Sequence, residues 1–123
     1  MDAVDLNTIN FTLQYARGIS KVEKKGKKEQ TVSYALPGRK ALKIKSPEIK
    51  NFTTGIVMVE IFVDRDGNVI HARVVPDKSI IYNKAIVTNA EQAAQESKFS
   101  ADPDAPKKTK GYFTYRFIKV GSE

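Results

Sequence analysis

The residues best suited to metal chemistry form a short acidic segment in the middle of the chain. Asp64–Asn68, with the sequence DRDGN, offers the carboxylate and amide oxygens that Ca²⁺ prefers. An EF-hand loop that starts at Asp64 needs glycine at its sixth position and glutamate at its twelfth, but Val69 and Val75 stand there. We therefore interpret the segment as a hairpin turn and expect no metal site.

A histidine and a strand glutamate are the next candidates, for acid–base chemistry. His71 is the only histidine of the chain, and no nucleophile is spaced to pair with it. We expect Glu60 to pair with Arg73 or Arg116 on a neighbouring strand. Cysteine is absent, which excludes thiolate metal sites and a cysteine nucleophile, and no glycine-rich phosphate loop occurs. The sequence predicts a protein that is not an enzyme and has no cofactor.

A predicted β-hairpin over residues 55–75 positions these side chains. In residues 55–63 both alternating sets are largely apolar, which is typical of a strand covered on one face and partly on the other. Gly67 can adopt the positive φ that a tight reversal requires. Residues 69–75 then alternate between apolar and polar, as expected of the returning strand.

A helix and a third strand complete the predicted fold. In residues 82–97 apolar and small side chains recur at the helical interval. Phe99 follows as an anchor, and Pro103 and Pro106 exclude helix beyond it. Residues 111–120 alternate aromatic and polar side chains, as expected of a strand. The sequence predicts an α+β fold: a three-stranded antiparallel sheet in β-β-α-β order with one helix packed on one face.

The first part of the chain is less regular. Residues 9–15 and 31–36 alternate as strands do, and we interpret the lysine-rich run 21–29 between them as a solvated loop or hairpin tip. The predicted organisation is an N-terminal extension able to form an extra hairpin (1–36), an extended basic connector (37–54) and the domain itself (55–123).

Composition limits the class of partner. The chain has 123 residues, of which 41% are hydrophobic and 28% charged, values typical of one globular domain. Its 21 lysines and arginines exceed its 14 acidic residues and give a formal charge of +7. This balance favours an anionic partner or surface.

Three segments, in this order, resemble the TonB C-terminal domain family. Gly55–Val69 is similar to the first hairpin of that family, Asn89–Phe99 to the end of its helix, and Gly111–Phe117 to its last strand. The resemblance covers about residues 36–120, and the lead-in tracts Leu36–Arg39 and Ser46-Pro47 are similar to those of members from Bacteroidetes-type bacteria.

The resemblance implies a periplasmic domain of a TonB-like energy transducer. Such a protein is anchored in the inner membrane and works with an ExbB–ExbD type complex. Its C-terminal domain captures the TonB box of a TonB-dependent outer-membrane transporter by β-strand addition. By resemblance, the peptide would bind the exposed edge of the last strand and the segment before the first strand. The implied peptide-binding residues are Ser46, Pro47, Ile49, Gly111, Tyr112, Phe113, Thr114, Tyr115, Arg116, Phe117 and Ile118.

Other arrangements of that edge stay open. Its unpaired N–H and C=O groups can pair with the N-terminal segment or with a second copy of the chain in a homodimer. A self-associating structural module of the envelope is therefore one alternative function. A basic nucleic-acid-binding domain is another, because Tyr112, Phe113 and Tyr115 suit base stacking. We do not expect nucleic acid, because Phe113 and Tyr115 are needed beneath the helix.

Overall fold

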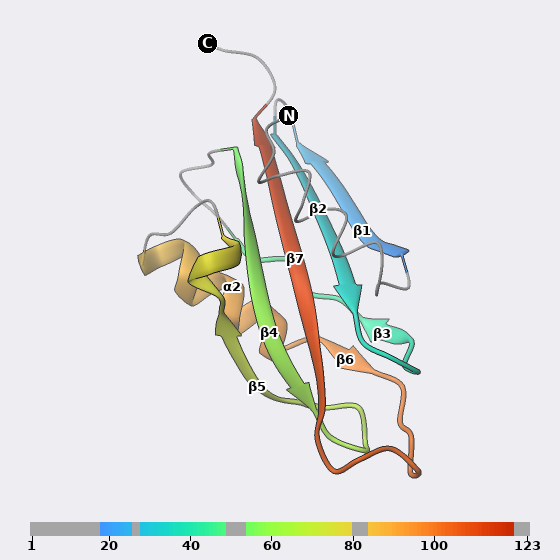
Figure 1. Ribbon diagram of the computed structural model, residues 1–123. Helices are drawn as coiled ribbons and strands as arrows, with labels where there is room; N and C mark the ends of the chain where they lie inside the picture. Colours follow the sequence, from blue (N-terminus) through green and yellow to red (C-terminus); the bar gives the residue numbers. More distant parts are fainter. Residues whose placement is uncertain (1–17, 26–27, 49–53, 80–83, 120–123) are drawn as a thin grey trace.

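The computed structural model describes residues 18–25, 28–48, 54–79 and 84–119 (Figure 1). Along the chain its elements are β1 (Gly18–Lys25), β2 (Lys28–Ala35), β3 (Ala41–Lys43), β4 (Gly55–Val63), β5 (Val69–Val74), η1 (Pro76–Lys78), α2 (Lys84–Gln95), β6 (Lys98–Phe99) and β7 (Thr109–Lys119). Five strands form one antiparallel sheet in the order β1-β2-β7-β4-β5. β3 and β6 form a separate two-stranded sheet.

The predicted α+β class, with an antiparallel sheet and a helix, is confirmed. The predicted number of strands is wrong, because β1 and β2 from the N-terminal part join the expected three in one sheet. α2 is the one α-helix in the described ranges. No helix within those ranges combines the length and the apolar character needed to cross a membrane.

The predicted central hairpin is present as β4 and β5, which pair antiparallel. In the turn between them the Gly67 amide donates to the Asp64 carbonyl oxygen (3.1 Å), and the Asp64 amide donates to the Asn68 carbonyl oxygen (3.0 Å). Gly67 has a φ of +91°, and a Cβ at this position would overlap the carbonyl oxygen of Phe99. The turn therefore requires glycine for two reasons, its backbone angle and the close approach of a second chain segment.

α2 covers one face of the sheet with small residues. Of the predicted range 82–97, residues 82 and 83 lie outside the described residues, and the helix ends at Gln95. Its buried side chains are those of Ile86, Ala90, Ala93 and Ala94, which let the helix pack close to the strands. The core between the layers consists of Val32, Tyr34, Leu36, Val57, Val59, Ile61, Val63, Ala72, Val74, Ile86, Ala90, Ala93, Ala94, Phe99, Phe113, Tyr115 and Phe117.

Aromatic rings fill the part of this core where β2, β6 and β7 meet. Phe99 is fully buried, and its ring centroid lies 5.5 Å from that of Tyr34 and 5.6 Å from that of Phe113. Phe113 in turn stacks on Tyr115 with a centroid distance of 5.7 Å. The prediction that Phe99 is an anchor and that Phe113, Tyr115 and Phe117 of the last strand belong to the core is confirmed.

The N-terminal part of the chain forms a hairpin of β1 and β2. The predicted strand 31–36 is confirmed as β2, whereas the predicted strand 9–15 lies outside the described residues. The lysine-rich run 21–29 was expected as a solvated loop or hairpin tip. It does lie where β1 ends and β2 begins, but most of it is strand, in β1 and at the start of β2. A charged run is tolerated there because β1 is outermost in the sheet, and lysines are common on such strands.

The connector 37–54 contains two features that were not expected. Ala41–Lys43 pair with β6 as β3. Arg39 is buried, and its Nη1 donates to the carbonyl oxygens of Asp64 (3.0 Å) and Ser100 (3.1 Å). This guanidinium therefore ties the start of the connector to the β4–β5 turn and to the segment after β6.

Candidate functional site

β7 was expected to present a free edge for a peptide, but it is an interior strand (Figure 1). β4 pairs with it along Gly55–Val63, and β2 pairs with its other side along Lys28–Ala35. The prediction that Gly111–Ile118 offer a free edge is therefore wrong. Of the alternatives left open for this edge, pairing with the N-terminal segment of the same chain is confirmed.

Core packing holds β2 against β7. Val32 and Leu36 are fully buried, and Tyr34 is only 7% exposed. Each buried apolar side chain of this size contributes roughly 1.5–3 kcal/mol. The summed contribution of these three side chains is comparable in size with the net free energy of unfolding of a typical domain, roughly 5–15 kcal/mol. A peptide that competes for β7 would have to replace this packing, so β7 is not accessible at low energetic cost.

The side chains of β7 divide between the two faces of the sheet. Gly111 is buried where β7 passes β2, and a Cβ at this position would lie 2.6 Å from the carbonyl oxygen of Ala35. The Tyr115 hydroxyl is buried without a hydrogen-bond partner, and burial raises the pKa of Tyr115 far above its usual value. The core face carries Phe113, Tyr115 and Phe117, and the other face carries Tyr112, Thr114, Arg116 and Ile118.

The predicted site residues of the connector meet β2 and not a free edge. The Pro47 carbonyl oxygen accepts a hydrogen bond from Gln30 Nε2 of β2 (3.3 Å). Gln30 is the Cα partner of Phe117, so this hydrogen bond joins Pro47 to the strand that closes β7. Ile49 lies outside the described residues.

A small polar hollow of about 120 Å³ lies between this connector and α2. Ser46 Oγ, from its wall, is buried without a hydrogen-bond partner. Asn89 Nδ2 of α2 donates to the Glu48 carbonyl oxygen (2.7 Å) and holds the connector to the helix. A hollow of this size with polar walls suits ordered water better than a peptide side chain.

Glu60 lies half-buried on β4 between two cations. Its carboxylate is 3.1 Å from Lys110 Nζ and 3.9 Å from Arg73 Nη2. The expected pair with Arg73 is therefore present, but the closer partner, Lys110, was not predicted. The hydrogen bond with Glu60, and after it the one with Tyr112, raises the pKa of Lys110 above its usual value. These contacts describe a structural ion pair.

The other residues that suggested chemistry have local structural partners. The His71 ring is exposed on β5, with its centroid 5.8 Å from that of Phe62. Asp64 Oδ1 accepts the amide hydrogen of Asn68 (2.9 Å) and so helps to close the turn. Within the described residues, no three histidine or acidic side chains group in a way that could hold a metal ion.

The outer edge of β5 is covered at both of its ends. The Val74 amide donates to Glu91 Oε2 of α2 (2.9 Å), so a helix side chain takes the place of a neighbouring strand. At the other end β6 lies beside the turn, where the Phe99 amide donates to the Gly67 carbonyl oxygen (2.9 Å). A long strand cannot be added to β5 without displacing these partners.

The outer edge of β1 differs, because no described strand pairs with it. Successive residues of a strand direct their N–H groups to opposite sides. The Val75 amide donates to the Met58 carbonyl oxygen (2.8 Å), which fixes these directions in β4. Partners in the registers of β4 with β7, β7 with β2 and β2 with β1 then give the N–H directions in each following strand. In β1 the N–H groups of Val22 and Lys24 point away from β2.

The sequence contains one feature that predicts β1, the dipeptide Gly26-Lys27, which the interpretation of residues 21–29 as a loop or hairpin tip did not use. β1 ends at Lys25 and β2 begins at Lys28, so Gly26-Lys27 stands between the two strands. A dipeptide that begins with glycine is typical of a two-residue hairpin loop. The same dipeptide predicts strands on both sides of it, including the lysine-rich one.

No protein-family model matches this chain, and no curated protein or solved structure is similar enough to count as a match.

Proposed function

We propose that this chain is a protein-binding domain of the cell envelope that captures an extended polypeptide by strand addition on the outer side of β1. One observation carries the proposal: β1 is an eight-residue strand whose outer side has no partner among the described strands. An extended peptide gains main-chain hydrogen bonds when it completes such an edge. β7 is closed by β2 and β5 is covered at its ends, so β1 is the edge best suited to this role.

The charge of β1 indicates the kind of polypeptide that it would accept. The strand contains Lys21, Lys24 and Lys25 against one acidic residue, Glu23. Lysines on an outermost strand disfavour pairing with arbitrary strands. Opposite charges across a strand pair stabilise it, and the whole chain carries +7. The proposed partner is therefore an extended segment that carries acidic residues.

The resemblance to the TonB C-terminal domain family extends the proposal to location and partner. The chain order β4, β5, α2, β7 and the sheet order β5-β4-β7 agree with the β-β-α-β arrangement that the resemblance implies, which supports a periplasmic location. The bound segment would then belong to a TonB-dependent outer-membrane transporter, with an ExbB–ExbD type complex as a further partner. In this chain the segment would pair with β1 in place of β7.

Binding is proposed in preference to catalysis because Glu60 and Tyr115, two ionisable side chains on the sheet, are respectively ion-paired and enclosed. Glu60 pairs with Lys110 and Arg73, and the Tyr115 hydroxyl is enclosed in the core. Neither arrangement leaves an acid and a base facing a common reactive position.

The test uses a peptide of the length of β1 that alternates glutamate and valine, added to the ¹⁵N-labelled chain. We expect amide shifts to concentrate on Gly18–Lys25. Val22→Pro removes an outward N–H group and should weaken binding at least about tenfold, whereas Val22→Ala keeps the group and should bind like the parent chain. Shifts that centre on β7, or equal binding by both variants, would contradict the proposal.

Two further measurements separate the alternative functions. Capture of the acidic peptide depends mainly on main-chain pairing, so it should weaken much less with salt than binding of a nucleic acid, which would fall steeply. Sedimentation analysis identifies self-association: a mass that rises with concentration, without peptide binding, would select the self-associating envelope module.

A further inference from the structure

A β-bulge on β5 creates a second feature, at the opposite edge of the sheet from β1. His71 is the Cα partner of Phe62, and Val69 is the partner of Val63, so Ile70 between them has no partner on β4. Extra residues of this kind redirect side chains and often occur beside binding sites. Ile70 is 48% exposed, a large value for an apolar side chain of this size.

The redirected isoleucine borders an open hollow of about 390 Å³. Phe62, Ile70, His71 and Lys108 line it. Phe62 is half-buried with its ring against that of His71, so the Phe62 ring and the Ile70 side chain form the apolar walls and the His71 imidazole adds a polar one. Its volume lies at the lower end of the range found for small-molecule sites, and its lining combines apolar surface with a few polar groups.

The charged group at this hollow is a cation without a described anionic partner. Lys108 is exposed in the loop that leads into β7, and no described carboxylate forms an ion pair with it. On the same face of the sheet the Glu60 carboxylate is already shared by Lys110 and Arg73. The local field therefore favours a negatively charged ligand.

Little free backbone remains along the edge of β5, which favours a small ligand over a polypeptide. Glu91 occupies the Val74 amide at one end, and β6 lies beside Gly67 at the other. Between them lies the bulge at Ile70, which interrupts the regular ladder. An extended chain would find too short a run of free backbone to pair with, but a compact ligand needs only the hollow.

We propose that this hollow binds a small organic carboxylate with an aromatic or branched aliphatic body. The body packs between Phe62 and Ile70, and the carboxylate accepts a charge-assisted hydrogen bond from Lys108 Nζ, with the His71 imidazole as a second polar contact. This site is separate from the β1 edge and does not depend on peptide capture.

The test compares phenylacetate with phenylacetamide, which has the same shape and no charge, by ¹H–¹⁵N shift mapping on the full chain. We expect shifts at Phe62, Ile70 and His71 and a dissociation constant in the range of about 1–10 mM. The acid should bind about two- to fivefold more tightly than the amide, which is the worth of an ion pair with an exposed lysine.

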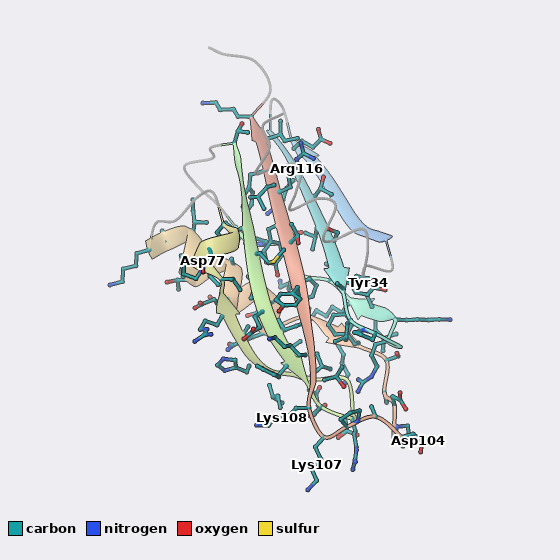
Figure 2. All side chains as sticks on the ribbon, in the orientation of Figure 1. Tyr34, Asp77, Asp104, Lys107, Lys108 and Arg116 are labelled. Carbon is teal, nitrogen blue, oxygen red and sulfur yellow. The ribbon has the colours of Figure 1, made fainter. Side chains whose placement is uncertain are left out.

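Two lysine variants locate the charge, because Lys107 and Lys108 are neighbours in the same loop (Figure 2). Lys107 extends away from the sheet in Figure 2 and does not line the hollow, so it serves as the matched control. Lys108→Gln should remove the preference for the acid, whereas Lys107→Gln should keep it. Ile70→Ser should weaken the acid and the amide alike.

Three outcomes would overturn the proposal. One is the absence of shifts around the hollow at about 20 mM phenylacetate, a concentration above the expected dissociation constant. The second is equal affinity for the acid and the amide. The third is an equal loss in both lysine variants, which would show attraction to the general positive charge and no defined contact.

Discussion

Truncation of Leu36 to alanine would measure how firmly the N-terminal hairpin belongs to the folded core. Leu36 directly follows β2 and is fully buried in the core. Its Cδ1 lies against Gly111 of β7, so close that a Cβ at Gly111 would be 2.6 Å from it. The side chain thus fills space between the hairpin and the strand that the hairpin closes.

The expected loss follows from this enclosure. Removal of a fully buried leucine side chain costs its transfer free energy and leaves a cavity, together about 2–5 kcal/mol. For a domain whose total stability is about 5–15 kcal/mol, this is a large fraction. Urea unfolding followed by circular dichroism should show a lower midpoint with an unchanged slope.

Leu42→Ala is the matched control, because Leu42 on β3 is 65% exposed. We expect it to change the free energy of unfolding by no more than about 0.5 kcal/mol. If Leu36→Ala cost less than about 1 kcal/mol, β2 would be a loosely attached extension, since a cavity in a packed core costs more. The argument that β7 is inaccessible to a peptide would then fail.

Two other substitutions probe the packing and the charges of β7. Gly111→Ala places a Cβ against the Ala35 carbonyl oxygen, so we expect about 1–3 kcal/mol of destabilisation in the same unfolding assay, and an unchanged midpoint would contradict the close approach. Glu60→Gln should lower the raised pKa of Lys110 towards its ordinary value of 10.5, as measured by NMR titration of the lysine side chain. In the parent chain Lys110 is fully charged below about pH 10.5, and its contribution to the ion pair with the Glu60 carboxylate is lost as the pH rises through the raised pKa of Lys110. An identical Lys110 pKa in the variant would exclude Glu60 as the cause of the shift.

Local periodicity predicted the elements whose hydrophobic pattern is strong. β4 and β5 flank a turn that Gly67 marks, and α2 shows its buried face through Ala90 and Ala93. β7 has aromatic residues at alternate positions that enter the core, Phe113 and Tyr115 among them. In each case the periodicity within a single chain segment is enough to predict the element.

The pairing of β2 with β7 could not be predicted in this way. The two strands are separated by most of the chain, and alternation within each shows which face is apolar but not which strand lies beside it. β1 was still harder to predict, because its lysine-rich sequence is typical of a loop. These lysines are tolerated because the strand is outermost in the described sheet. The predicted peptide site failed for this reason.

Buried polar contacts were also beyond the sequence. Arg39 stands in a basic segment that suggests a solvated surface, yet it is buried and donates to two carbonyl oxygens from distant turns. Nothing in its local pattern distinguishes it from the exposed Lys40 beside it. Only the convergence of three chain segments gives the guanidinium its acceptors.

Amide hydrogen exchange of the chain without a partner reports which strand edge is closed and which is open. We expect slow exchange for Thr114 and Arg116, whose N–H groups point to β2, and fast exchange for Val22 and Lys24 on the outer side of β1. The acidic peptide should then slow the exchange of Val22 and Lys24 alone. Fast exchange at Thr114 and Arg116 together with protection at Val22 and Lys24 would contradict the account.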